Sequence, residues 1–441
     1  MKTVSLKKNR AVGVYFMMIF IFALSIRIIF AFGGNNSLIA DAHFYELTGS
    51  SIWQGSGFVL NGKPTAKMCP GYPIFIAGIY SLFGRNFTAI RVVQALADAL
   101  MCAVIYLIAS RLFDNKVGVL SGLLCSLHYY FLKTIQVIRP ETLQMFFIVL
   151  AVFYWLKWRE DYRKVNMALM ALSSSIAIML KANVVFLPFL YLFVELIRFL
   201  KNRSPDFKKT ALSFLIFSLV FSLPILPWIY RNNRVFNSLI FFTTNYGKAM
   251  YCSYNVPEGK KFGIISDDDP VLLQAAKIPS EVERDRFLGK KANEYIVAHK
   301  AEVIRQVPIK ALFFWSPFDW ETLGEGQAVF NFATVFILPF SIAGLFLLRK
   351  RFAELITIIM PIIYFFAMSL IFQGLPRYRL AIEPFLIILA AFCIAHLYGN
   401  FSKRKTVLLV SLWLMLNFTL FIYSDSVLQG VRFLARSACI W

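Results

Sequence analysis

A polar stretch from Asp41 to Gly84 interrupts an apolar chain and holds the side chains best suited to chemistry. It opens with Asp41-Ala-His-Phe-Tyr45 and carries Lys67-Met-Cys-Pro-Gly-Tyr-Pro73 in its middle. A carboxylate takes up a proton and a lysine stabilises negative charge, so the stretch has the parts for proton abstraction beside an anion. His43 would orient the acid or ligate a metal ion.

Two further groups of candidates follow later in the chain. Glu141 comes directly after Arg139-Pro140, and Arg377-Tyr-Arg379 precedes another apolar run. A second carboxylate over the same cavity would orient a substrate, and the arginines would bind a lipid phosphate or an anionic headgroup. Plainer explanations stay open: Asp41 would cap a helix, Glu141 is an ordinary first-turn acid, and arginines near a membrane end extend to the interface.

The composition identifies a membrane protein, since 59% of the 441 residues are hydrophobic and 17% are aromatic. The apolar runs are continuous and do not alternate, which excludes a strand-built barrel. We therefore predict an all-α polytopic membrane protein. About eleven transmembrane helices are expected: 11–32, 87–110, 117–132, 141–156, 166–180, 183–199, 210–230, 328–348, 352–371, 380–398 and 406–424.

The net charge of +22 is distributed as the topology of a membrane protein requires. With the amino terminus inside, the inner segments hold 21 Lys and Arg residues, and the three short outer loops hold 5. This bias predicts a cytoplasmic amino terminus and, with an odd number of spans, an outer carboxyl terminus. Since membrane topology accounts for so much of the charge, nucleic acid is not an expected partner.

The spans divide the chain into three parts. Residues 1–230 form an amino-terminal transmembrane module of about seven spans, with a first outer loop, 33–86, that carries Asp41. Residues 231–327 form an outer soluble insertion, and residues 328–441 form a module of about four spans. Both large outer loops are expected to carry interfacial helices, and Ser280 with Glu283 predicts a helix that runs to about Lys300.

Two other features predict structure and not catalysis. Asp98 lies near the middle of the second span and is expected to pair with an arginine, whereas Arg27 would reach the outer interface. Three cysteines outside the spans, Cys69, Cys252 and Cys439, allow one disulfide but do not fix its pairing.

Several motifs, taken in order, resemble the bacterial protein-O-mannosyltransferase-like and aminoarabinose-transferase-like branch of the GT-C glycosyltransferases. The resemblance covers about residues 10–400. It rests on Asp-x-x-x-Tyr after the first span, Lys-x-x-Pro-Gly-Tyr-Pro, Leu82-Phe-Gly84, Arg91, Pro227-Trp-Ile-Tyr-Arg-Asn232, Phe236, Thr244-Asn-Tyr-Gly247 and Arg377-Tyr followed by Pro384. The chain departs from relatives in having Asp41-Ala42 in place of an acidic pair and Lys67-Met-Cys-Pro in place of Lys-Pro-Pro.

The resemblance implies a transfer of a hexosyl or pentosyl group, with inversion, from a polyprenyl-phosphate sugar. Asp41 would be the general base and Glu141 the second catalytic acid. The expected ligands of the donor phosphate are Lys67, Arg377 and Arg379. Residues expected to support substrate binding are His43, Tyr45, Tyr72, Arg139, Asn245 and Tyr378.

The charge bias predicts that the site lies on the extracytoplasmic face, and the resemblance implies a bacterial plasma membrane. The acceptor would be a lipid, a glycan or a protein. Some relatives bind a divalent metal ion in the outer loops, but no ligands are assigned in this chain. Two alternatives stay open, a transporter or flippase of lipid-linked glycans and a lipid-linked glycan polymerase or ligase. The lack of an internal sequence repeat favours an enzyme over a transporter.

Overall fold

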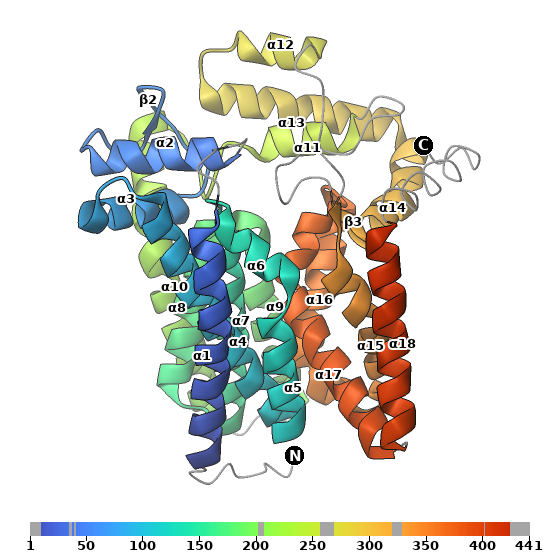
Figure 1. Ribbon diagram of the computed structural model, residues 1–441. Helices are drawn as coiled ribbons and strands as arrows, with labels where there is room; N and C mark the ends of the chain where they lie inside the picture. Colours follow the sequence, from blue (N-terminus) through green and yellow to red (C-terminus); the bar gives the residue numbers. More distant parts are fainter. Residues whose placement is uncertain are drawn as a thin grey trace.

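The computed structural model describes residues 10–34, 38, 41–201, 207–255, 269–319, 329–400 and 402–423. These residues form a bundle of long helices with shorter helices lying across one end, drawn at the top of Figure 1. Six helices in the described part of the chain are long and apolar enough to cross a membrane, and five shorter helices are also apolar. The predicted all-α membrane fold is confirmed; the count of eleven spans and their orientation remain predictions.

The first half of the bundle contains nine helical elements. Polar caps begin two of them, since Asn86 Oδ1 accepts from the Ala89 N–H at 3.1 Å and Asp114 Oδ1 accepts from the Lys116 N–H at 2.8 Å. The elements are α1 (Arg10–Phe32), α4 (Phe87–Leu112), α5 (Asn115–Ser126), α6 (Tyr129–Gln136), α7 (Glu141–Asp161), α8 (Lys164–Leu180), η1 (Ala182–Val184), α9 (Leu187–Leu200) and α10 (Phe207–Phe236).

One predicted span differs from the structure. The run 117–132 is broken after Ser126, so that α5 and α6 replace a single helix. Hydrophobicity does not mark such a break, because the apolar side chains continue through it. Helix α10 also continues to Phe236, past the predicted boundary at residue 230.

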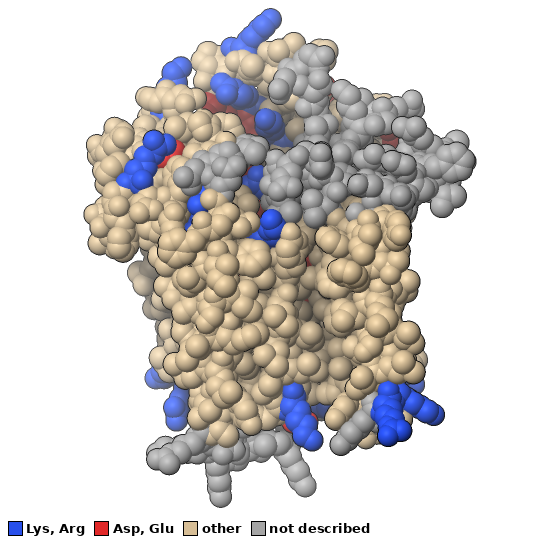
Figure 2. Space-filling model, viewed as in Figure 1, with Lys and Arg blue, Asp and Glu red and all other residues tan. Residues whose placement is uncertain are grey.

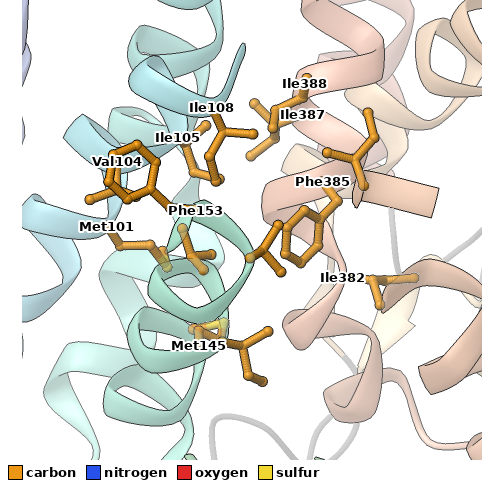
Figure 3. Close-up of a cluster of buried hydrophobic side chains, with 14 of the residues drawn as sticks. Met101, Val104, Ile105, Ile108, Met145, Phe153, Ile382, Phe385, Ile387 and Ile388 are labelled. Carbon is orange, nitrogen blue, oxygen red and sulfur yellow. The ribbon is translucent and has the colours of Figure 1, made fainter. Parts of the chain in front are cut away.

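The second half of the bundle packs against the first through a shared apolar core. Its elements are α15 (Phe332–Leu347), η2 (Arg349–Arg351), α16 (Phe352–Ile371), η3 (Pro376–Ala381), α17 (Glu383–Asn400) and α18 (Lys403–Ile422). Figure 3 shows Ile105 and Ile108 of α4 directed toward Ile387 and Ile388 of α17 within one apolar cluster. This core fixes the two halves relative to each other, and with them the loops at the bundle's ends.

The end of the bundle that carries Asp41 is built from the two long connections. The first contains α2 (Asp41–Trp53), β1 (Val59–Leu60), β2 (Lys63–Pro64) and α3 (Gly71–Phe83). The second contains α11 (Tyr246–Tyr254), α12 (Pro270–Ala276), α13 (Glu281–Ala298), α14 (Lys300–Phe314) and β3 (Phe318–Asp319), which pairs with β4 (Val329–Phe330). We call this the loop end of the bundle.

Helix α13 begins where the Ser280 and Glu283 pattern predicts it to begin. It begins after Ser280, whose Oγ accepts from the Glu283 N–H at 3.3 Å. Within β1–β2, Val59 pairs with Pro64, and the turn residues Asn61 and Gly62 have φ values of 52° and 75°. Positive φ at both positions is the geometry of a tight hairpin turn, which explains the Asn-Gly sequence.

Buried ion pairs hold the bundle together. Arg27 of α1 donates to Asp98 of α4, and both side chains are fully buried. The predicted partner of Asp98 is therefore confirmed, but Arg27 does not reach the interface as expected. In a low-dielectric interior a buried carboxylate attracts the nearest cation, and Arg27 lies on the adjacent helix.

The surface carries charge at both ends and little between them. Figure 2 shows Lys and Arg atoms around the lower rim of the bundle and mixed charges over the loop end, with an uncharged band in the middle. This pattern is typical of a protein that crosses a bilayer. Cys69 and Cys252 are free thiols, and Cys439, the third cysteine considered for a disulfide, lies outside the described residues.

Candidate active site

Asp41 and Arg377 meet at the loop end, although the first begins α2 and the second lies in η3. Arg377 Nη1 is 3.5 Å from Asp41 Oδ2. The Asp41 side chain is 54% exposed and that of Arg377 is 18% exposed. The pair is therefore accessible to a ligand from the open side of Asp41, while the arginine is held by its surroundings.

A second ion pair lies close to the first. Lys181 Nζ is 2.9 Å from Glu141 Oε1 and 5.2 Å from the centroid of the Tyr378 ring. The charges of Arg139 and Arg377 also act on the Glu141 carboxylate. Its other oxygen, Oε2, is buried and forms no hydrogen bond with any described residue. A buried oxygen of this kind is an acceptor suited to a ligand hydroxyl.

Two tyrosines pack beside these carboxylates. The rings of Tyr45 and Tyr72 meet edge to face with their centroids 5.3 Å apart, and Tyr72 Oη donates to Gln94 Oε1 at 2.6 Å. Burial raises the pKa of Tyr45 well above its usual value, and the negative charges of Glu141 and Asp41 raise it further. The Tyr45 hydroxyl therefore stays neutral and available as a hydrogen-bond donor.

Lys67 packs against α2, the helix that Asp41 begins. Its Nζ is 3.6 Å from the centroid of the Phe44 ring, which is a close cation–π contact. The negative charge of Asp41 also acts on the Lys67 ammonium. Burial lowers the pKa of Lys67, and the positive charge of Lys248 lowers it further. An amine in this setting gains from binding an anion, because the anion offsets both effects.

The loop that carries Lys67 is fastened to the second connection by Glu281, the first residue of α13. Glu281 Oε2 accepts from Thr65 Oγ1 at 2.8 Å, and Oε1 accepts from the Ala66 N–H at 2.7 Å and from the Thr244 hydroxyl. The Thr65 oxygen in turn accepts from the Lys67 N–H at 3.0 Å. One carboxylate thus fixes the backbone on which Lys67 stands.

Close backbone packing also explains the Pro-Gly-Tyr-Pro motif. A Cβ on Gly71 would lie 2.7 Å from the carbonyl oxygen of Met179, at the end of α8. Only glycine allows α3 to begin there. Tyr72 and Lys181 are positioned by the two helices that meet at this contact.

Arg379 does not join the group. Its side chain is fully buried, with Nε 3.1 Å from Glu383 Oε1 and Nη1 donating to the carbonyls of Phe314 at 2.7 Å and Ser316 at 2.8 Å. Glu383 also lies 3.1 Å from His128 Nε2. The guanidinium predicted to bind the donor phosphate is instead directed into the protein, because residues two apart in a 3₁₀-helix face different sides. Its effect is to fix η3, and hence Arg377.

The remaining predicted residues lie around this group. Arg139 is buried and acts electrostatically on both Tyr72 and Glu141. Asn245 precedes α11, next to Thr244, whose N–H donates to the Ala66 carbonyl at 2.8 Å. His43 is exposed on α2, with its ring 6.1 Å from that of Phe44.

Sequence reasoning missed Lys181 and Glu281. Lys181 is one of the five basic residues of the short outer loops, so it breaks the inside bias as Arg377 does, and that signal marks it as a candidate. Glu281 has no such signal, since it stands in an ordinary capping-box sequence.

No metal site is assigned. Among the residues that the structure describes, no three His, Cys, Asp or Glu side chains gather closely enough to hold a metal ion. The described side chains around Asp41 thus do not supply a ligand set, and no chemical step is derived through a metal. One solved structure of the archaeal oligosaccharyltransferase considered next was obtained in complex with Zn and sulfate.

Comparison with known proteins supports the resemblance seen in the motifs. Residues 63–228 match the family described as dolichyl-phosphate-mannose-protein mannosyltransferase. An uncharacterized protein of Aquifex aeolicus is 26% identical over 153 residues, which are 34% of this chain and 31% of that protein. The family match includes Lys67, Tyr72, Arg139, Glu141 and Lys181.

One solved structure shares the fold, and a second is less similar. The oligosaccharyltransferase AglB of Archaeoglobus fulgidus, in complex with an inhibitory peptide and a dolichol-phosphate, superposes with a TM-score of 0.55 at 12% identity. That match covers 97% of this chain and 56% of AglB, so this chain spans little more than half the length of AglB. ArnT of Cupriavidus metallidurans, bound to undecaprenyl phosphate, gives a TM-score of 0.44 at 11% identity over 88% of this chain and 80% of ArnT.

Proposed function

Because this integral membrane protein is related to the GT-C glycosyltransferases, we propose that it transfers a hexosyl or pentosyl group from a polyprenyl-phosphate sugar to an acceptor hydroxyl. Asp41 takes the proton from the acceptor hydroxyl. The acceptor oxygen then bonds to the anomeric carbon as the bond from that carbon to the phosphate oxygen breaks. The departing polyprenyl phosphate keeps the electron pair, and attack from the opposite face inverts the anomeric centre.

Basic groups stabilise the departing phosphate. Arg377 Nη1 is 3.5 Å from Asp41 Oδ2, and the negative charge of Asp41 acts on the Lys67 ammonium. Both cations therefore lie near the proposed base. Fixed cations of this kind act where negative charge develops, and they need no reorganisation during the reaction. Arg379 contributes indirectly, by fixing η3.

Glu141 binds the sugar in this proposal. Its Oε1 is held by Lys181, and its buried Oε2 is positioned to accept from a sugar hydroxyl. Tyr45, whose hydroxyl is under the electrostatic influence of both carboxylates, supplies a neutral donor. Tyr72, Arg139 and Tyr378 line this side of the site, while Asn245 and His43 flank it.

The observation that carries the proposal is the Asp41–Arg377 pair, formed by opposite ends of the chain. We place it on the outer face of a bacterial plasma membrane, because the lysines and arginines of the opposite end mark that end as cytoplasmic. Nucleotide donors are cytoplasmic, so an outer site requires a donor that arrives on a lipid. We also propose the division of the chain into two transmembrane modules, 1–230 and 328–441, joined by an outer insertion, 231–327.

A vesicle assay tests the function against its main rival. Purified protein in sealed vesicles would receive polyprenyl phosphates that carry radiolabelled hexoses or pentoses, with a cell-envelope extract as the source of acceptor. We expect label to enter the acceptor fraction, with an equimolar release of free polyprenyl phosphate. A flippase would move label across the bilayer with the sugar–phosphate bond intact. A polymerase or ligase would use only donors that carry a longer glycan.

Replacing Glu281 by alanine should weaken use of the donor. The variant loses the carboxylate that holds Thr65 and Ala66, so Lys67 is no longer fixed. Hydrogen bonds to a charged group are worth about 1.5–3 kcal/mol each, so a fall of roughly tenfold or more in kcat/KM for the donor is expected. Steady-state kinetics with Glu283→Ala as the matched control measure this. Unchanged donor kinetics in Glu281→Ala would show that the loop is positioned by other contacts.

A further inference from the structure

An open groove of about 790 Å³ runs along α13, beside the start of α11 and outside the cluster around Asp41. The two helices approach closely because glycines meet, and a Cβ on Gly247 would lie 1.9 Å from the Asp285 carbonyl oxygen. The side chains on either side of that contact form the walls. The groove is lined by Tyr246, Asp285, Arg286, Lys290, Asn293 and Glu294, among others.

The walls are mostly apolar, with the exposed ring of Tyr246 and the exposed Val297 side chain, and they carry hydrogen-bonding groups of both kinds. Tyr246 is 59% exposed, and Asn293 is also exposed and supplies both a donor and an acceptor. Figure 2 shows charged atoms of both signs over this end of the molecule. The two acids and two bases that line the groove cancel, so its net charge does not favour an anionic or a cationic ligand.

The charged groups of the walls are only partly engaged. Asp285 Oδ1 accepts from the Gly247 N–H at 2.7 Å, and Glu294 Oε2 is 3.0 Å from Lys291 Nζ. The pair of Glu294 is exposed, and exposed pairs of this kind are worth little and exchange readily for other partners. The hydrogen bonds that these charged side chains can still form suit hydroxyl groups as partners, because a hydroxyl donates to carboxylates and accepts from cations.

The groove leads to the proposed active site. Tyr246 follows Thr244 by two residues, and Thr244 is bonded to the backbone beside Lys67. The Tyr246 ring is also 6.0 Å from the ring of Phe372, which shortly precedes Arg377 in the chain. The end of the groove at Tyr246 thus lies against the two segments that carry the donor-binding cations.

We propose that this groove binds the acceptor, and that the acceptor is an uncharged saccharide chain. The inference rests on the proposed transfer, and it narrows the acceptor from lipid, glycan or protein to a glycan. A sugar ring packs its C–H face on Tyr246 and bonds its hydroxyls to Asn293 and the carboxylates. A chain bound along the groove directs its end toward Lys67 and Asp41.

Binding measurements on the full-length protein in lipid nanodiscs test the groove. The probes are neutral gluco-, manno- and galacto-oligosaccharides, a heparin oligosaccharide and an uncharged peptide of similar length, followed by saturation-transfer NMR. We expect at least one neutral oligosaccharide to bind, and Tyr246→Ala and Asn293→Ala each to weaken it, Tyr246→Ala by about tenfold. Tyr246→Phe should keep most of the affinity, since the ring remains. Tyr230→Ala, an equally exposed tyrosine outside the groove, is the matched control.

The proposal is overturned if no neutral oligosaccharide binds, or if Tyr246→Ala binds it as tightly as the wild type. Binding of the peptide or of the heparin oligosaccharide in its place, with the same dependence on Tyr246, also overturns it. Polyprenyl phosphate binding, measured in the same nanodiscs, should be equal in the wild type and Tyr246→Ala. If the wild type did not bind polyprenyl phosphate, the proposed sugar transfer would be contradicted. The oligosaccharide binding in the groove would be unaffected by that outcome.

Discussion

Asp41→Asn is expected to abolish sugar transfer, with kcat falling by roughly 10²–10⁴-fold. The amide has nearly the same shape as the carboxylate but does not accept the acceptor's proton. Asparagine is also tolerated at the start of a helix, so α2 should keep its position. Quantitation of released polyprenyl phosphate under single-turnover conditions measures the effect.

Two controls separate catalysis from folding in this variant. Thermal unfolding and binding of polyprenyl phosphate should match the wild type, because the cations that hold the phosphate are unchanged. Gln54→Ala, at an exposed residue just past the end of α2 that has no role in the proposed site, should retain most of the activity. If Asp41→Asn transferred sugar at the wild-type rate, Asp41 would serve only as a helix-start residue and the base would lie elsewhere.

Arg377→Ala should reduce kcat/KM for the donor by roughly 10²–10³-fold, the usual effect of removing one fixed group that stabilises a developing anion. Arg377→Lys should recover part of the loss, since it restores the charge without the planar guanidinium. The measurement is donor kinetics together with the dissociation constant of polyprenyl phosphate. Donor kinetics unchanged in Arg377→Ala would remove this residue from the phosphate site.

The neighbouring arginine gives a contrasting result. Arg379→Ala should act on folding, because it leaves the fully buried Glu383 without its closest arginine. Breaking a buried pair in this way costs about 3–5 kcal/mol. The two variants therefore separate by assay, with Arg377→Ala lowering donor use at normal stability and Arg379→Ala lowering the unfolding temperature.

Much of this architecture follows from short-range patterns in the sequence. The apolar runs mark the helices of the bundle, and the capping box of Ser280 marks the start of α13. Asp98 was expected to need an arginine because a charge inside the bundle requires a partner. Asp41, Glu141 and Arg377 lie near the outer ends of predicted spans and Lys67 lies in the first outer loop, so the sequence predicts that all four share one face of the membrane.

Side-chain direction was harder to predict. Arg377 and Arg379 are the same residue type two positions apart, so the sequence does not distinguish their side-chain directions. The contacts of Arg379 with Phe314, Ser316 and Glu383 direct its side chain into the protein. The break between α5 and α6 is hidden by continuous hydrophobicity. Glu281 acquires its role through a contact with Thr65, which is far away in the sequence, and a single sequence carries no trace of such a contact.

A structure of the protein with bound polyprenyl phosphate tests the central claim most directly. We predict that the phosphate lies at the loop end, with an oxygen about 2.7–2.9 Å from the Arg377 guanidinium, the usual length of a charge-assisted hydrogen bond. Lys67 should face the same phosphate, with Asp41 on the side open to the acceptor. A phosphate bound at the opposite end of the bundle, for example against the exposed bases of η2, would contradict the account.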